Sequence, residues 1–154
     1  LALLRAIGPD GHLVSIDRRE DHVAMARRNV SEFHGEAPNW STLVAEAKDG
    51  VAEQRADRVI LDLPEPGPVV PAAADALRPG GGLGCYLPTT GQLQELGDAL
   101  RAEPRFAAAQ TFETLQRPWH VAAGSVRPDH RMVAHTGFLT TVWRRANPAS
   151  TTGQ

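Results

Sequence analysis

The sequence predicts an α/β fold with a mostly parallel sheet and helices on both of its faces. Segments that look like strands and helices alternate four times along the 154 residues, at the spacing of strand–helix–strand units. The last two expected strands have no helix between them, which predicts antiparallel neighbours at one edge of the sheet. With 42% apolar and 22% charged residues, the chain has the composition of a globular domain.

The first part of the chain is expected to contain two helices and three strands. Apolar side chains recur at roughly helical spacing after residue 19, and Gly35 stops that helix. Each strand is a short apolar run that closes with or near an acid. In order, the expected elements are the end of a helix at 1–7, a strand at 12–17, a helix at 19–34 and strands at 41–47 and 56–62.

The second part is expected to contain two helices and three strands. Pro79, Gly80 and Gly81 end the first of these helices, and Thr89 or Thr90 caps the second. The elements are a helix at 69–77, a strand at 82–88, a helix at 90–104, a strand from 106, an irregular segment at 122–134 and a strand at 136–146. Residues 147–154 are expected to form a polar tail.

Three successive expected strands end in or near an acid: Asp17, Glu46 and Asp62. In an open α/β sheet, ligands bind outside the carboxyl ends of the strands. Asp17 suits the two hydroxyls of a ribose, and Glu46 suits an exocyclic amine such as adenine N6. Each acid alone is more often a solvated turn residue, but three acids at one edge favour a site for a nucleoside-containing cofactor.

The stretch "VILDLPEPG" at residues 59–67 carries Asp62 to the rim of the sheet. Pro64 and Pro66 follow at once, and they prevent the chain from continuing as a helix. A loop is therefore expected directly after this acid.

Charge is spread unevenly along the chain. Residues 104–154 carry six basic and two acidic side chains, whereas the net charge of the whole chain is −2. This asymmetry suggests an anionic partner near the C-terminal third, with an ordinary solvated surface as the alternative. The single Cys85 excludes an internal disulfide and favours the cytoplasm. No membrane span or secretory signal is visible, and no histidine has the partners of a tetrahedral metal site.

Several motifs carry a family resemblance. "LRPGGGLGCY" at residues 77–86 resembles the junction of helix, Pro-Gly-Gly and strand in class I S-adenosylmethionine-dependent methyltransferases. "IDRREDHVAMARRNV", "ADRVILDLPEP" and "RPWHVAAGSVRPDHRMVAHTGFL", in this order, resemble the bacterial, especially actinobacterial, tRNA (adenine-58-N1)-methyltransferases. The resemblance implies a Rossmann-like methyltransferase sheet and methyl transfer from S-adenosylmethionine to adenine N1 in tRNA. It also implies a cytoplasmic homotetramer.

The resemblance also implies roles for the three acids. Asp17 matches the acid that binds the cofactor ribose, and Glu46 matches the acid beside the cofactor adenine. Asp62 matches the acid next to the methyl group and the target base. Adenine N1 has no proton to lose, so Asp62 fits a carboxylate that accepts a hydrogen bond from N6 as positive charge develops on the ring.

Two departures from the family pattern stand out. Gly67 occupies a position where the family commonly has Trp, so a packing aromatic is missing beside the expected site. The family's first strand and Gly-rich cofactor loop precede the helix at which this sequence starts. Residues 1–146 are therefore expected to be the C-terminal part of a catalytic domain, with uncertain activity on their own.

The C-terminal signature contains the candidate RNA contacts. Such enzymes extrude the target base from folded tRNA. The basic candidates for holding phosphates or the displaced nucleotide are Arg117, Arg127, His130, Arg131 and His135. The alternative for His130 and His135 is structural, in which they tie the irregular segment to the sheet. Trp119 fits the core or a subunit interface better than base stacking.

Three alternative functions remain. The Pro-Gly-Gly junction alone also allows a class I methyltransferase with another substrate. A dinucleotide oxidoreductase would use Asp17 but would not explain the C-terminal signature. A non-catalytic RNA-binding or scaffold subunit of a tRNA methyltransferase complex fits the missing loop and Gly67, although retention of all three acids weighs against it.

Overall fold

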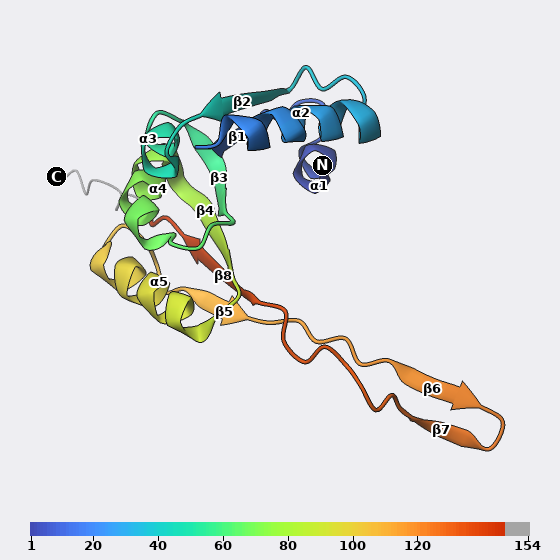
Figure 1. Ribbon diagram of the computed structural model, residues 1–154. Coiled ribbons are helices and arrows are strands. Elements are labelled where there is room, and N and C mark those ends of the chain that lie inside the picture. Colours follow the sequence, from blue (N-terminus) through green and yellow to red (C-terminus); the bar gives the residue numbers. More distant parts are fainter. Residues whose placement is uncertain (147–154) are drawn as a thin grey trace, which may run out of the picture. The chain divides into compact units, whose positions relative to one another are not determined.

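The computed structural model describes residues 1–146, so the predicted polar tail at 147–154 lies outside the described residues. The chain divides into two compact units, residues 1–54 and the residues from Arg55 onward. Each unit is described by itself (Figure 1). None of the helices formed by residues 1–146 is long and apolar enough to cross a membrane.

The first unit contains a two-stranded parallel sheet. Its elements are α1 (Ala2–Ile7), β1 (Leu13–Asp17), α2 (Glu20–Phe33), β2 (Trp40–Val44) and α3 (Ala47–Ala52). Strands β1 and β2 pair from Leu13 opposite Trp40 to Asp17 opposite Val44. Helix α2 buries Val23 and Val30, two of the apolar residues that predicted it. The short α3 was not predicted, because six residues that include Gly50 carry no clear helical period.

The second unit contains a four-stranded mixed sheet in the order β3-β4-β8-β5. Its main elements are β3 (Ala56–Leu61), the 3-10 turn η1 (Gly67–Val69), α4 (Val70–Ala76), β4 (Leu77–Leu87), α5 (Thr90–Ala102), β5 (Gln110–Phe112) and β8 (Phe138–Trp143). Strands β3 and β4 are parallel, whereas β8 is antiparallel to both β4 and β5. The predicted parallel pairing and the antiparallel last strand are therefore confirmed.

One face of this sheet forms the core of the second unit. Alternate residues of the strands are buried, which is the period expected for a half-buried sheet. The buried side chains include Val59, Leu61, Leu83, Cys85, Leu87 and Val142, together with Ala73 and Ala74 of α4 and Leu96 and Leu100 of α5. Burial raises the pKa of the Cys85 thiol to about 12.

The Pro-Gly-Gly junction needs glycine for a packing reason. A Cβ on Gly81 would lie 2.8 Å from the backbone oxygen of Arg78 and 3.1 Å from that of Asp57. Backbone atoms cannot move aside cheaply, so only glycine lets the start of β4 approach β3 this closely. The Arg78 and Asp57 side chains form an ion pair at the same place.

The segment expected to be irregular contains part of a β-hairpin. Strands β6 (Trp119–Ala122) and β7 (Ser125–Pro128) pair antiparallel around Gly124, whose φ is 74°. Every residue of β6 is exposed, so the strand shows none of the one-sided burial that reveals a strand in a sequence. We call residues 114–134 the arm; it leaves the sheet after β5 and returns before β8 (Figure 1).

Candidate functional site

Asp17 lies at the carboxyl end of β1, as predicted. Its backbone oxygen accepts a hydrogen bond from Ala45 N (3.1 Å), which joins the ends of β1 and β2. Its Oδ1 accepts a hydrogen bond from Arg19 N at 2.8 Å, and its Oδ2 lies 3.2 Å from His22 Nδ1. The Arg19 amide first, and His22 second among the favourable contacts, hold the pKa of Asp17 below its usual value. The side chain is 40% exposed, and lone pairs remain for further donors.

Glu46 lies just beyond β2 and is the N-cap residue of α3. Its side chain makes no capping hydrogen bond and is exposed, so the helix does not use the carboxylate. Helix α3 packs closely on the sheet at Gly50, where a Cβ would lie 2.8 Å from Ile16 Cγ2 and 3.2 Å from Leu43 Cδ2. This packing sets the position of Glu46 relative to Asp17, because Ile16 and Leu43 belong to β1 and β2. The first unit therefore brings these two acids to one edge of neighbouring parallel strands.

This edge fits the nucleoside part of a cofactor. A carboxylate with lone pairs to spare can accept both hydroxyls of a ribose, and a free carboxylate can accept an exocyclic amine. Asp17 keeps lone pairs for the two ribose hydroxyls. Glu46, whose carboxylate makes no capping hydrogen bond, can accept the amine.

Asp62 follows β3 in the second unit. The carboxylate is exposed, and it forms no hydrogen bond or ion pair with any of residues 1–146. Leu61 pairs with Cys85, so the next position along β4 beside Asp62 is Tyr86. Asp62 thus stands at the carboxyl ends of two parallel strands with its side chain free to meet a ligand.

Two side chains at the start of α5, those of Thr89 and Gln92, hold the loop after Asp62 through hydrogen bonds. Gln92 Nε2 donates to the backbone oxygen of Pro64 at 3.1 Å, and Thr89 Oγ1 donates to Gln92 Oε1 at 2.7 Å. Thr89 is also the N-cap of α5, since its Oγ1 accepts from Gln92 N at 3.4 Å. Our sequence reasoning missed Gln92, although Thr89 and Gln92 have the spacing of a capping box.

Gly67 forms a regular local structure without the family's usual aromatic. A Cβ on this residue would meet only Ala99 Cβ, at an ordinary 3.6 Å. Gly67 is therefore required neither by close packing nor by a positive φ. It begins the η1 turn, which leads directly into α4.

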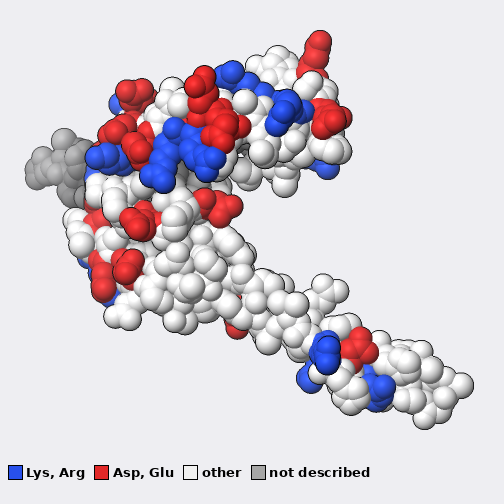
Figure 2. Space-filling model, viewed as in Figure 1, with Lys and Arg blue, Asp and Glu red and all other residues white. Residues whose placement is uncertain are grey.

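Four of the five candidate RNA-binding residues belong to the arm: Arg117, which is exposed before β6, and the three that lie close together in sequence, Arg127, His130 and Arg131. Arg127 is in β7 opposite His120, and His130 and Arg131 follow shortly after. All three are exposed. Figure 2 shows basic side chains gathered on the arm beside an acidic one; the only acid in the arm is Asp129. Trp119 in β6 is 57% exposed, so of its two predicted places, the core or a subunit interface, the core is wrong and the interface stays a prediction.

His135 is separate from these three and contacts the sheet. Its Nδ1 lies 2.8 Å from Glu113 Oε2 and its Nε2 lies 2.8 Å from the Pro88 backbone oxygen. The ring also contacts Phe138, with 4.7 Å between the ring centroids. The Pro88 carbonyl and then Glu113 raise the pKa of His135 above its ordinary value. Both ring nitrogens therefore have protein partners. This fits the structural alternative for His135, in which it ties the irregular segment to the sheet.

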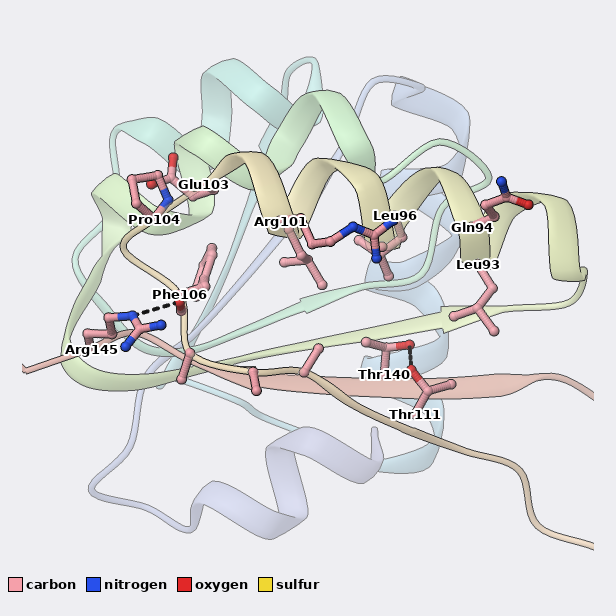
Figure 3. A pocket seen from close by; sticks show the side chains of 15 residues that line it. Leu93, Gln94, Leu96, Arg101, Glu103, Pro104, Phe106, Thr111, Thr140 and Arg145 are labelled. Atoms are coloured by element: carbon pink, nitrogen blue, oxygen red, sulfur yellow. Dashed lines mark hydrogen bonds between the residues drawn. The ribbon is translucent and has the colours of Figure 1, made fainter.

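The second unit also has a groove between α5 and strands β5 and β8 (Figure 3). Its volume is about 630 Å³, and Leu93, Leu96 and Phe106 are among the apolar side chains that line it. Thr111 and Thr140 hydrogen bond to each other there at 2.9 Å. None of the predicted site residues lines this groove, so it is separate from the candidate site. Across the described residues, no group of three or more His, Cys, Asp or Glu is arranged to hold a metal ion.

Comparison with protein families matches residues 1–128 to the model of the tRNA methyltransferase complex GCD14 subunit. A tRNA (adenine(58)-N(1))-methyltransferase of Thermus thermophilus is 37% identical over 145 residues, which are 94% of this chain and 56% of that protein. A tRNA (adenine(57)-N(1)/adenine(58)-N(1))-methyltransferase of Methanocaldococcus jannaschii is 28% identical, over 90% of this chain and 57% of that protein. The chain thus spans about half the length of these relatives.

Solved structures give the same fold. A SAM-dependent O-methyltransferase from Thermotoga maritima has a TM-score of 0.85 and 30% identity, over 94% of this chain and 54% of that one. A tRNA (m1A58) methyltransferase from Aquifex aeolicus has a TM-score of 0.75 and 23% identity, over 88% of this chain and 54% of that one. The predicted Rossmann-like class I methyltransferase fold is confirmed. The chain belongs to the GCD14 family of tRNA methyltransferase complex subunits.

Proposed function

We propose that the protein transfers a methyl group from S-adenosylmethionine to N1 of an adenine in tRNA. The observation that carries this proposal is the pair of acids Asp17 and Glu46 at one edge of neighbouring parallel strands, in a chain of this family. The Thermus thermophilus relative is a tRNA (adenine(58)-N(1))-methyltransferase, which supports the same reaction.

Asp17 and Glu46 hold the cofactor in this proposal. The carboxylate of Asp17, kept ionised by the Arg19 amide, accepts the two ribose hydroxyls. Glu46 accepts a hydrogen bond from the exocyclic amine of the adenine. The bound cofactor supplies an electrophilic methyl group on its sulfonium.

Asp62 acts on the target base. Adenine N1 carries a lone pair and no proton, so the attack on the methyl group requires no base. Positive charge then develops on the ring and makes N6 a stronger donor. The free carboxylate of Asp62 accepts that hydrogen bond and stabilises the charge where it forms.

The arm binds tRNA in this proposal. Arg127, His130 and Arg131 are exposed and lie close together in sequence at the end of the hairpin. Basic side chains that contact phosphates supply most of the sequence-independent affinity of proteins for nucleic acids. We assign these three residues to the phosphates or to the displaced nucleotide.

We also propose a homotetramer that acts in the cytoplasm, where its tRNA substrate would be found. Several large apolar side chains of the arm are more than half exposed, namely Leu115, Trp119, Val121, Val126 and Val133. A surface of this kind is typical of an interface with another subunit.

Two other functions are kept as alternatives. The relative from Thermotoga maritima is described as an O-methyltransferase, so another substrate is possible for a chain with this fold. A non-catalytic RNA-binding or scaffold subunit is the second, because the matched family is described as a subunit of a complex.

Product analysis distinguishes the three functions. The complete protein is incubated with unmodified tRNA and S-adenosylmethionine, and the tRNA is digested to nucleosides and analysed by mass spectrometry. The proposal expects 1-methyladenosine. Binding of tRNA without any methylated nucleoside would favour the scaffold subunit. Cofactor binding without tRNA binding would favour another substrate.

A further inference from the structure

The arm rejoins the sheet through a short stretch at residues 135–137, which we call the return segment. His135 in this segment contacts residues that directly follow two different strands. Pro88 comes after the last residue of β4, and Glu113 comes after the last residue of β5. With distances of 2.8 Å to both partners, one imidazole joins the ends of β4 and β5 to the segment that leads into β8.

The chemistry of these partners fixes the protonation state of the ring. The Pro88 carbonyl only accepts hydrogen bonds, so His135 Nε2 must donate to it. An ionised Glu113 carboxylate also only accepts, so Nδ1 must donate as well. Both nitrogens carry a proton only in the imidazolium. A neutral ring would leave one acceptor facing another at 2.8 Å.

Other groups around the ring are consistent with this state. Glu113 is the charged side chain in contact with His135 among the described residues, and Phe138 contributes an uncharged ring. The Pro88 carbonyl and Glu113 both raise the pKa of His135. Since the pKa in the folded protein exceeds the ordinary value, the contacts stabilise the fold at lower pH. This stabilisation is lost as the pH rises through the folded-state pKa.

The return segment also lies against Tyr86, the neighbour of Asp62 in register. Tyr86 Oη donates to the Thr136 backbone oxygen at 2.5 Å. A Cβ on Gly137 would clash with the Tyr86 ring at Cε2 and Cζ, so the segment packs closely against that ring. The contacts of His135 therefore fix where the arm rejoins the sheet relative to Asp62.

We propose that His135 is a positioning residue, whose protonated ring fastens the return segment to the rim of the sheet beside Asp62. The arm is then held in place for RNA while the ring is protonated, and it is released when the ring loses its proton. The RNA part of this inference rests on the proposed function, in which the arm binds tRNA and Asp62 meets the target base. His135 itself contacts no RNA in this scheme.

The first test reads the proton directly and needs no substrate. The histidines of the complete protein are labelled with nitrogen-15, and the ring signals of His135 are assigned by comparison with His135→Gln. We expect a titration midpoint above the usual value of about 6.5, with both ring nitrogens carrying protons below that midpoint. Glu113→Gln, which keeps the shape of the side chain, should lower the midpoint. A midpoint at or below the usual value, or one that Glu113→Gln does not change, would overturn the proposal.

The second test measures the dissociation constant for tRNA across the same pH range. For wild type we expect affinity to fall about fivefold more between acidic and alkaline pH than for His135→Gln, the scale of a partly exposed ion pair. His34→Gln is the matched control, because His34 is exposed at the end of α2 and lies outside the arm, and it should follow the wild-type profile. Identical profiles for wild type and His135→Gln would overturn the RNA role. Failure of the wild type to bind tRNA would overturn the proposed function, whereas the proton reading would still decide the role of His135 in the fold.

Discussion

Asp62→Asn tests the central acid of the proposed reaction. The Asp62 carboxylate is exposed and forms no hydrogen bond or ion pair with any of residues 1–146. Replacing it by an amide of the same shape should therefore leave the fold intact. Asp17 and Glu46 are untouched, and affinity for S-adenosylmethionine should stay at the wild-type value. Methyl transfer to tRNA should fall, because the amide carries no negative charge to meet the charge that develops on the adenine.

The size of the loss follows from the electrostatics of this exposed position. Two unit charges about 4 Å apart interact by about 1 kcal/mol in water and about 4 kcal/mol near a protein surface. The bound base removes part of the water around Asp62, so the loss lies between these limits, at about 1.5–3 kcal/mol. The corresponding fall in the methyl-transfer rate is about 10- to 150-fold.

A single-turnover assay with labelled S-adenosylmethionine and tRNA measures that rate. Glu65→Gln is the matched control, because Glu65 lies in the same loop, is exposed and loses the same charge. Its rate should stay close to wild type. A rate for Asp62→Asn within about twofold of wild type would refute the role of Asp62, as would an equal fall in Glu65→Gln.

Four further predictions concern Gln92, Gly50, Gly97 and Cys85. Gln92→Ala removes the hydrogen bond to Pro64, so the methyl-transfer rate should fall with unchanged cofactor affinity; Gln94→Ala, on the exposed side of the same helix, is the control. Gly50→Ala forces a Cβ to within 2.8 Å of Ile16 Cγ2, so urea denaturation should show a loss of about 1–2 kcal/mol after the gain in helix propensity. Gly97→Ala in α5 should instead be stabilising, because its nearest neighbour is the flexible Arg101 guanidinium. The buried Cys85 thiol, with its pKa raised to about 12, should resist alkylation at mildly alkaline pH until the protein unfolds.

The elements that the sequence predicts well are those with a buried face. Val23 and Val30 of α2, and Val59 and Leu61 of β3, repeat with the period of their elements because one side packs on a core. The ends of β1 and β3, and hence Asp17 and Asp62, follow from the same patterns. Glu46 was also expected at the end of its strand, although α3 begins just after it.

The features that the sequence does not reveal depend on distant contacts or on exposed backbone. The hairpin β6–β7 has no buried face, so its residues show no period. His135 contacts Pro88, which is 47 positions away, and Glu113, which is 22 positions away. No local sequence pattern predicts contacts between residues so far apart. Gln92 differs, because its spacing from Thr89 is a recognisable local signal that could have been used.

The arm is inserted between two strands that already neighbour each other in the sheet. Thr111 and Phe112 of β5 pair with Thr140 and Leu139 of β8, so the chain leaves and re-enters the sheet at one point. Lengthening such a closed loop costs only about 0.6 kcal/mol for each doubling, and it does not shift the strand register. Evolution can therefore lengthen, shorten or recompose the hairpin while the sheet edge that carries Asp62 is inherited unchanged. The arm is the part of this molecule in which related proteins can diverge in length and surface charge at the least cost to the fold.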